Sequence, residues 1–365
     1  MDMYPQRAGE VLDVIKSGDL NWQLFVHVAS NHLVLQTLYL NFARNGLLHY
    51  LPQDLCSHLK YIHELNCERN KIIIDHAVSI NDLFCMEGIT PIFMKGTGNI
   101  MDGLYSCHGE RIMSDMDILI PDERMEDAAE ILFGRGYRCN EKYDPQYRLS
   151  MMHYPPLWKE GLPAPVELHR LPVSLGYVDR FGCDAVNGDK KASNLNGNCY
   201  VMSDRHKIIH NFIHSHFMHW AFLHSMFFLR DFHDLMLLSG RENAQKVLAG
   251  SGYSSRRVAG YLKVVAKVGG LEPVSHRKFK RKWGFFSYRH DKALKWPYLS
   301  TVMFLLIRGV KLYFTLPLKA VWDKRYRAFV ARRLKNPGWY IRHIKGYKEK
   351  LFSRPLKSCR KAEID

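Results

Sequence analysis

Apolar residues recur at three- and four-residue spacing through the first part of the chain, which is the period of amphipathic helices. The segments AGEVLDVIKSG, NWQLFVHVASNHLVLQTLYLNFARNG and PQDLCSHLKYIHELNCERNKIIIDHAVSINDLFCMEG carry this pattern. Gly18, Gly46 and Gly88 mark the expected helix ends, and Pro52 suits the start of the last helix. We therefore expect an N-terminal helical region over residues 1–88.

The pattern changes to short apolar runs between residues 89 and 183. ITPIFMKG (89–96) and MDILIP (116–121) are typical of buried strands, and the first ends in a Lys-Gly pair that predicts a loop. APVELHRLPV (164–173) alternates as a strand does, and RMEDAAEILFGRGY (124–137) is an amphipathic helix. This mixture predicts an α+β fold, in which a small mixed β-sheet core is flanked by N-terminal and C-terminal helical regions.

Helical spacing returns after residues 184–199, whose Asn, Gly and Lys content predicts a loop. Residues 200–270 are expected to form a helical region that packs on the core, with Ser203 or Asp204 as an N-cap and Gly240 as a stop. The last module, residues 271–365, is basic and rich in aromatic residues.

Two groups of polar residues interrupt the helical pattern of residues 203–240. His206, His210 and His214 stand four apart, and this spacing could present imidazoles to a metal, but bulky apolar neighbours favour packing. The later group, RDFHD (230–234), carries Arg230, Asp231 and Asp234; it predicts a helix cap or a buried ion pair rather than contact with substrate.

Charge is concentrated at the C-terminal end of the chain. Residues 271–365 carry 25 Lys and Arg against 6 Asp and Glu, whereas the whole chain has a net charge of +16. The uncharged run WPYLSTVMFLLI (296–307) is too short to span a bilayer. An apolar run flanked by cations and aromatic residues suits a helix on an anionic membrane surface, which residues 296–360 could contact. A packed helix with a basic solvated face fits equally well, and nucleic acid is disfavoured because no recognised motif accompanies the charge.

The eight cysteines are scattered and form no CxxC pair. This argues against a disulfide framework or a zinc site and for a reducing compartment. The segment MDMYPQRAGEVLD lacks the features of a secretory signal. We therefore expect a cytoplasmic protein, which could bind peripherally to the inner face of a membrane.

Candidate chemistry centres on RIMSDMDILI, residues 111–120. Asp115 and Asp117 would share one strand face about 7 Å apart at their Cα atoms, and Glu167 is a solitary carboxylate in another apolar strand. Three carboxylates could hold two Mg²⁺ ions for phosphoryl chemistry. Most Asp-x-Asp pairs are solvated strand ends, so the spacing alone is weak. The case for a metal and phosphate site is strengthened by the Lys-Gly turn at residues 95–96, by Arg111 and by the later strand carboxylate. His169 could orient Glu167.

Several separated elements, in this order, resemble an uncharacterised bacterial nucleotidyltransferase family of the DNA-polymerase-β-like nucleotidyltransferase superfamily. They are NWQLFVHVASNHLVLQTLYLN, GITPIFMKG, RIMSDMDILIP, AAEILFGRGY and VELHRLPV, and the resemblance covers about residues 10–240. It implies that residues 89–183 form the nucleotidyltransferase catalytic core. It also implies that Asp115, Asp117 and Glu167 are the catalytic metal ligands, and that Lys95, Gly96, Thr97, Arg111 and Ser114 bind the nucleotide.

One departure concerns the phosphate turn, which the superfamily builds with Gly-Ser shortly before its Asp-x-Asp pair. Here the comparable turn is KGTGN (95–99), with Thr97 in place of serine, and the segment MDGLYSCHGE (101–110) accounts for the wider spacing. The phosphate grip is therefore expected from Lys95, Thr97 and backbone amides.

The resemblance implies a Mg²⁺-dependent enzyme that moves a nucleotidyl group from a nucleoside triphosphate to an unidentified acceptor, possibly in surface-polysaccharide synthesis. Two other functions stay open. One is a non-catalytic nucleotide-binding scaffold at the membrane. The other is a DxD glycosyltransferase, which is disfavoured because the apolar run follows Asp117 instead of preceding Asp115.

Overall fold

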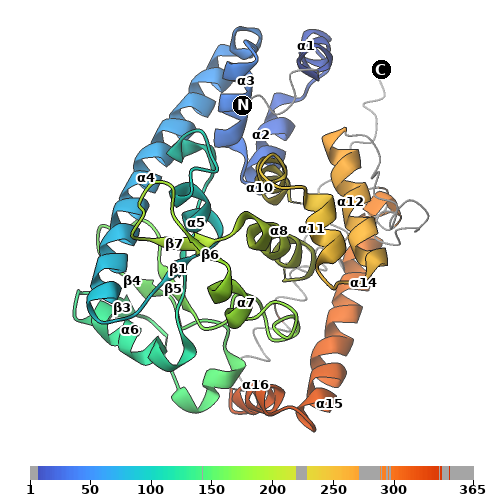
Figure 1. Cartoon of the computed structure of the whole chain (residues 1–365). Coiled ribbons are helices and arrows are strands. Elements are labelled where there is room, and N and C mark those ends of the chain that lie inside the picture. The colour runs from blue at the N-terminus through green and yellow to red at the C-terminus, as the bar shows by residue number, and fades with distance from the viewer. Residues whose placement is uncertain are drawn as a thin grey trace.

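A computed structural model describes residues 7–141, 143–218, 228–270 and 297–336, together with isolated positions at 288, 290–292, 295, 338 and 345. It is an α+β structure with one mixed seven-stranded sheet and helices on both sides of it, as the sequence predicts (Figure 1). None of the helices in these described segments is both long and apolar enough to cross a lipid bilayer.

The N-terminal helices confirm the predicted stops. Gly18, Gly46 and Gly88 each follow a helix and adopt positive φ angles of 77°, 65° and 68°, which favour glycine. The expected helix over residues 21–46 is broken by Leu33, whose φ is 56°. The elements are α1 (Ala8–Lys16), α2 (Trp22–Asn31), α3 (Leu35–Arg44), η2 (Leu48–Tyr50) and α4 (Gln53–Met86).

Helix α4 is 34 residues long and begins directly after Pro52, its N-cap. Its first turns close a small apolar cluster with α1 and α3 that contains Ile15, Phe42 and Leu59. Its later turns, from Ile73 onward, join the main core beside the sheet. The long helix therefore ties the N-terminal helices to the sheet, along one side of which it runs (Figure 1).

The sheet has the strand order β3-β4-β5-β2-β1-β7-β6. The central strands β2 and β5 run parallel, and β1 is antiparallel to β2. Their residues are buried on both faces, which explains why the sequence shows continuous apolar runs there. The strands are β1 (Ile92–Phe93), β2 (Met116–Leu119), β3 (Arg138–Cys139), β4 (Leu157–Trp158), β5 (Val166–His169), β6 (Lys190–Ala192) and β7 (Tyr200–Met202).

Two sequence predictions about this region were wrong. Residues 184–199, predicted as a loop, contain most of α7 (Cys183–Gly188) and all of β6, and the sheet therefore extends beyond residue 183 to Met202. The expected loop after β1 is instead helix α5 (Lys95–Met101). Its Gly98 packs so closely on the Phe93 carbonyl that a Cβ atom would overlap it.

Helices on the other side of the sheet come from residues 204–269 (Figure 1). Ser203 caps α8, because its hydroxyl accepts a hydrogen bond from the His206 amide. The helical run predicted up to Gly240 is interrupted, since α8 passes into a π-helical turn and α10 begins only at Leu229. The elements are α8 (Asp204–Ile213), η6 (His214–Met218), α10 (Leu229–Ser239), α11 (Ala244–Gly250) and α12 (Ser255–Gly269).

Much of the basic module of residues 271–365 lies outside the described segments. The described part forms a long helical rod at one edge of the molecule, and a last helix turns back beneath the core (Figure 1). Its elements are α14 (Pro297–Val310), η7 (Lys311–Thr315), α15 (Leu316–Ala320) and α16 (Lys324–Leu334). The remaining short elements of the chain are η3 (His108–Glu110), η4 (Asp122–Arg124), α6 (Met125–Phe133) and η5 (Pro145–Ser150).

Candidate functional site

Asp117 and Glu167 lie side by side because they are register partners on the neighbouring parallel strands β2 and β5. His169, at the end of β5, shares the face of Glu167, since residues two apart on a strand point the same way. Its Nε2 lies 2.8 Å from Asp117 Oδ1 and 3.4 Å from Glu167 Oε2. One atom of each of these three side chains lies within 4.8 Å of the others, so together they could hold a metal ion.

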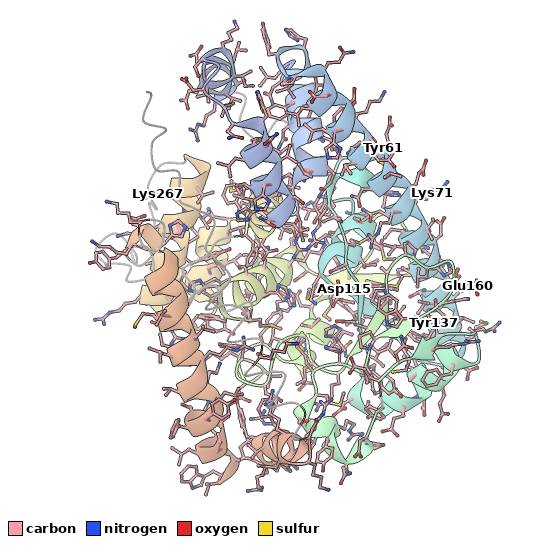
Figure 2. The ribbon with its side chains drawn as sticks, turned by 180° about the vertical axis from the view of Figure 1, so that it is seen from behind. Tyr61, Lys71, Asp115, Tyr137, Glu160 and Lys267 are labelled. Atoms are coloured by element: carbon pink, nitrogen blue, oxygen red, sulfur yellow. The ribbon has the colours of Figure 1, made fainter. Side chains whose placement is uncertain are left out.

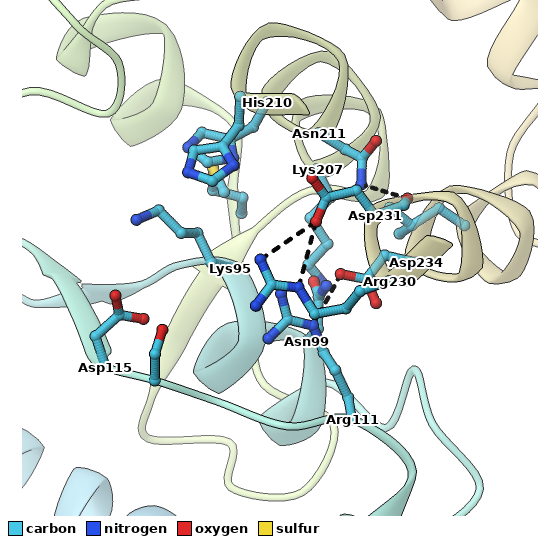
Figure 3. A pocket seen from close by; sticks show the side chains of 14 residues that line it. Lys95, Asn99, Arg111, Asp115, Lys207, His210, Asn211, Arg230, Asp231 and Asp234 are labelled. Atoms are coloured by element: carbon cyan, nitrogen blue, oxygen red, sulfur yellow. Dashed lines mark hydrogen bonds and ion pairs between the residues drawn. The ribbon is translucent and has the colours of Figure 1, made fainter. Parts of the chain in front are cut away.

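Asp115 lies just before β2, on the strand face of Asp117, and lines a cavity (Figure 3). It is half-buried and is not part of the tight group formed by Asp117, Glu167 and His169. Burial and the negative charge of Asp117 raise the pKa of Asp115. The negative charge that Asp115, Asp117 and Glu167 bring together favours a bound cation.

Lys95 provides a cation from within the protein. Its Nζ donates a hydrogen bond of 2.5 Å to Asp117 Oδ1. Burial alone would lower the pKa of Lys95, but Asp117 and Asp115 raise it overall, so the amine is charged. Lys95 has a φ of 47° at the start of α5, a left-handed conformation that costs a non-glycine residue energy and that recurs at active sites.

The carboxylate of Asp117 is almost fully buried and stays ionised. Burial opposes ionisation, but Lys95 and His169 together hold the pKa of Asp117 well below its usual range. Its Oδ2 is buried and has no hydrogen-bond partner among the described residues. A buried charged oxygen without a partner is costly, and a divalent cation bound by Asp117, Glu167 and Asp115 would satisfy it with the oxygen ligands that Mg²⁺ prefers.

The cavity beside these carboxylates has a volume of about 120 Å³ and is lined mainly by polar side chains (Figure 3). This is smaller than the roughly 300–1,000 Å³ of pockets that enclose whole small molecules, so it suits the phosphates of a nucleotide. Its lining residues are Lys95, Asn99, Arg111, Ser114, Asp115, Met202, Lys207, His210, Asn211, His214, Arg230, Asp231, Asp234 and Leu238.

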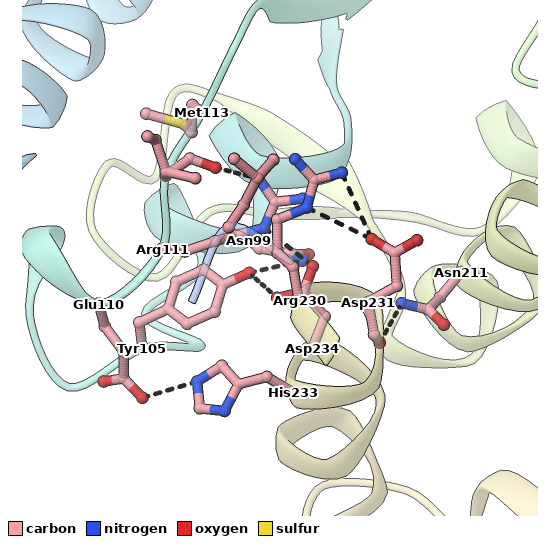
Figure 4. A network of polar contacts seen from close by, with 12 residues as sticks. Asn99, Tyr105, Glu110, Arg111, Met113, Asn211, Arg230, Asp231, His233 and Asp234 are labelled. Atoms are coloured by element: carbon pink, nitrogen blue, oxygen red, sulfur yellow. Dashed lines mark hydrogen bonds and ion pairs between the residues drawn. The ribbon is translucent and has the colours of Figure 1, made fainter. Parts of the chain in front are cut away.

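Arg111 is held rigidly at the cavity wall. Its Nε donates a 2.9 Å hydrogen bond to Asp234 Oδ2 on α10, and Tyr105 donates a 2.7 Å bond to the other oxygen of that carboxylate (Figure 4). Burial opposes the charge, but Asp234 raises the pKa of Arg111 overall. Gly96 is required beneath it, since a Cβ atom there would overlap the guanidinium.

Helix α10 supplies the buried ion pairs that its sequence predicts. Besides the contact of Asp234 with Arg111, Arg230 lies 3.4 Å from Asp231. His233 lies 2.9 Å from Glu110, whose carboxylate also contacts Arg44 (Figure 4). These contacts join α10 to the segment that carries Arg111, more than 100 residues earlier in the chain.

A cluster around Asp102 escapes the sequence analysis. Lys207 on α8 contacts the fully buried Asp102 carboxylate, together with Lys191 at 2.9 Å and Arg241 at 2.7 Å. The three cations also lie near Asp204, and of this cluster Lys207 lines the cavity. Lys207 stands in the polar start of α8, beside Asp204, Arg205 and His206, so no local pattern singles it out.

Three residues predicted near the nucleotide differ in their positions. Ser114 lines the cavity, and Gly96 lies under Arg111 without lining it. Thr97 was expected to grip phosphate, but its side chain is fully buried and its hydroxyl lies 3.7 Å from Met113 Sδ. The short helix α5 turns Thr97 toward the core, so the expected grip by Lys95 and Thr97 is reduced to Lys95.

His206, His210 and His214 were predicted to pack rather than to bind a metal, and they are packed in the structure. His210 lines the cavity, and its Nε2 lies 3.0 Å from the Pro172 carbonyl oxygen, which fixes it as the donor. Burial and the nearby Lys95 lower the pKa of His210 to about 4, so its ring is neutral. His206 packs edge-on against Phe181. None of these histidines belongs to a metal-binding group in the described part of the chain.

Comparisons with known proteins give one match. The model of a family described as "Uncharacterised nucleotidyltransferase" matches residues 18–274, which is more than half of the chain. No curated protein and no solved structure matches. The matched range includes the sheet, the carboxylates of β2 and β5, and the cavity. The chain therefore belongs to the uncharacterised nucleotidyltransferase family, whose activity is the transfer of nucleotidyl groups.

Proposed function

We propose that the protein is a Mg²⁺-dependent nucleotidyltransferase whose metal ligands are Asp115, Asp117 and Glu167. The observation that carries the proposal is the pairing of Asp117 with Glu167 beside Lys95, which contacts Asp117 and lines a polar cavity. Asp115 adds a third carboxylate on the same side. Nucleotidyl transfer needs this combination, because carboxylates bind the metal while cations bind the phosphates.

The divalent ions, when bound, lower the pKa of the acceptor group and offset negative charge on the leaving pyrophosphate. The protein supplies orientation and fixed positive charge. Asp234 and the Ile112 carbonyl hold the Arg111 guanidinium at the cavity, and Gly96 leaves room for it. Such preorganised charge stabilises a transition state without reorganisation during the reaction.

Lys95 has a separate role in this proposal. Its amine lies 2.5 Å from Asp117 Oδ1. Lys95 also lines the cavity, so the same amine could reach phosphates bound there. Lys207 and its neighbours around Asp102 add positive charge on the α8 side of the cavity.

The test measures binding and turnover separately. Calorimetry with each of the four nucleoside triphosphates and Mg²⁺ is expected to reveal one preferred nucleotide, and that nucleotide should release pyrophosphate when cell extract supplies the acceptor. Glu167→Gln should abolish release and leave the fold intact. Nucleotide binding without pyrophosphate release, with every acceptor fraction, would support the non-catalytic scaffold instead.

We further propose that the C-terminal rod lies on an anionic membrane surface. Six large apolar side chains follow one another three or four residues apart along it and are all exposed, forming an apolar stripe: Met303, Leu306, Val310, Phe314, Leu318 and Trp322. Exposed contiguous apolar surface is unusual for a solvated helix. The surrounding module is strongly basic, which matches an anionic lipid surface. An acceptor carried by the membrane would then meet the enzyme there.

A further inference from the structure

A second group of metal-binding side chains lies on α4, away from the carboxylates of β2 and β5. His63 and Cys67 are one helical turn apart, and Cys107 comes from the segment just before η3. His63 Nε2 lies 3.6 Å from Cys67 Sγ and 3.7 Å from Cys107 Sγ. All three ligand atoms lie within 4.8 Å of one another.

We propose that His63, Cys67 and Cys107 bind a zinc ion. With Zn–S near 2.3 Å and Zn–N near 2.0–2.1 Å, the nitrogen–sulfur edges of a tetrahedral site are about 3.5–3.6 Å long. The two distances in the structure match these edges. The cysteines are dispersed in the sequence, and for that reason the sequence argued against a zinc site.

The choice of metal follows from the ligands. Two thiolates and an imidazole are soft donors, which select zinc over magnesium. Two thiolates also balance the charge of a divalent ion, so the site is neutral where His63 is buried and both cysteines are half-buried. No fourth His, Cys or carboxylate joins the group among the residues that the structure describes, so water or an added thiol would complete the tetrahedron.

The backbone is built for the close approach of Cys107 to α4. A Cβ atom on Gly109 would overlap Cys67 Sγ and lie 2.7 Å from His63 Cε1, so only glycine fits there. Two asparagines of α4 fasten the same segment. Asn66 donates to the carbonyl of Gly109 at 3.0 Å, and Asn70 donates to the carbonyl of His108 at 2.6 Å.

The zinc site would act as a clamp on the segment that leads to Arg111. Asn66 and Asn70 also donate to the Arg111 carbonyl, at 3.1 Å and 2.7 Å. These asparagines fix the backbone of Arg111 from α4, Asp234 fixes its side chain from α10, and the zinc ion would hold the Cys107 end of the same segment. Zinc binding itself does not depend on nucleotidyl transfer and can be tested alone.

The experiment measures metal content and cobalt spectra of the full chain. Wild-type protein, loaded with zinc and dialysed, is expected to retain about one zinc per chain. Cobalt(II) should give the intense thiolate-to-metal absorption bands of a tetrahedral sulfur site. Cys67→Ser and Cys107→Ser should lose both signals, whereas Cys85→Ser, an exposed cysteine on the same helix, should keep them.

A second measurement needs no variant. Zinc should protect Cys67 and Cys107 of the wild-type protein from alkylation, while the exposed Cys85 reacts in its presence and absence alike. The proposal is overturned if zinc is not retained, if the cobalt bands are absent, or if zinc leaves the alkylation of Cys67 and Cys107 unchanged. A disulfide between these two cysteines in protein purified under reducing conditions would also overturn it.

Discussion

Among single residues, Asp117 is the one for which a metal ion and the Lys95 amine compete. Asp117 Oδ1 contacts both Lys95 and His169, and its Oδ2 has no partner within the described structure. A metal ion at Oδ2 would lie close to the charged Lys95 amine, so the two cations compete for the negative charge of Asp117. The same amine also lines the cavity and would offset charge on bound phosphates, so its two effects can be separated experimentally.

Lys95→Met is expected to tighten Mg²⁺ binding and to slow nucleotidyl transfer by about 10²–10³-fold, the usual loss when a group that stabilises the transition state is removed. Turnover measured across a Mg²⁺ titration gives both the affinity for Mg²⁺ and the maximal rate of transfer. Lys71→Met, on the exposed face of α4 (Figure 2), is the matched control and should change neither. Weaker Mg²⁺ binding in Lys95→Met would contradict the competition.

The sequence predicts the carboxylates better than the cations. Asp117 and Glu167 could be paired because each interrupts a continuous apolar strand, and such strands lie next to each other in a small sheet. The contact between Arg111 and Asp234 spans 123 positions, and no local pattern encodes it. Thr97 was predicted to face the phosphates because the sequence indicated a loop after β1. The seven-residue helix α5 forms there instead and directs the Thr97 side chain into the core.

At the scale of elements, α10 and the segment before β2 are joined by buried charges. Asp234 binds both Arg111 and Tyr105, and Glu110 binds both His233 and Arg44. A buried ion pair contributes little compared with an apolar pair, but removing one partner is costly because the other charge is left buried. Removing one partner and replacing both partners should therefore change the free energy of unfolding by different amounts.

Asp234→Asn is expected to lower the free energy of unfolding by about 3–5 kcal/mol, because Arg111 then remains charged and buried. The double variant Arg111→Met/Asp234→Leu should regain most of that loss but still fail to bind nucleotide. Urea unfolding and calorimetry measure the two effects. Asp127→Asn breaks an exposed pair with Arg124 and should cost about 1 kcal/mol or less. Equal effects of Asp234→Asn and Asp127→Asn would be inconsistent with the buried pair.

The Glu110 contacts predict a pH dependence. Burial opposes ionisation of Glu110, but His233, Ser106 and Arg44 hold its pKa below the usual range. The unfolded chain, with a glutamate pKa of about 4.3, therefore takes up this proton first. The stabilisation is complete above that value and is lost as the pH falls below it. Between pH 6 and pH 3 the free energy of unfolding should fall more steeply in the wild type than in Glu110→Gln. Parallel curves for the two proteins would contradict this prediction.

The predictions of elements failed where packing overrides local pattern. Strand β6 has the sequence Lys-Lys-Ala and lies at the edge of the sheet, so it lacks the apolar alternation that identifies a strand. Helix α5 is too short for a period, and its glycines have low helix propensity. Its glycines allow close contact with Phe93 and Arg111, which a sequence does not show.

In the whole molecule, a polar cavity and an apolar stripe lie apart from each other. The cavity lies between the sheet and helices α8 and α10, whereas the stripe follows the rod of α14 and α15 at one edge (Figures 1 and 3). The sequence predicted a basic module there, and the exposure of its apolar residues comes from the structure.

Flotation with lipid vesicles tests the stripe. The protein should float with vesicles that contain phosphatidylserine and stay below with neutral vesicles. Phe314→Ser/Trp322→Ser should reduce the bound fraction at least about tenfold, since burying each aromatic side chain contributes roughly 1.5–3 kcal/mol. Met86→Ser removes a residue as exposed as these, 71% against 70% and 75%, but on α4, and should not change flotation. Equal flotation of all variants would remove the proposed membrane contact.

The central claim is that Asp117 holds the metal that activates the nucleotide, and the most direct measurement is pyrophosphate release by Asp117→Asn. Glu160→Gln, a charge-matched change on the exposed surface near Tyr137 (Figure 2), is the control. Asp117→Asn should lose Mg²⁺-dependent release while it remains folded, and Glu160→Gln should keep the wild-type rate. Undiminished release by Asp117→Asn would show that Asp117 does not hold the metal.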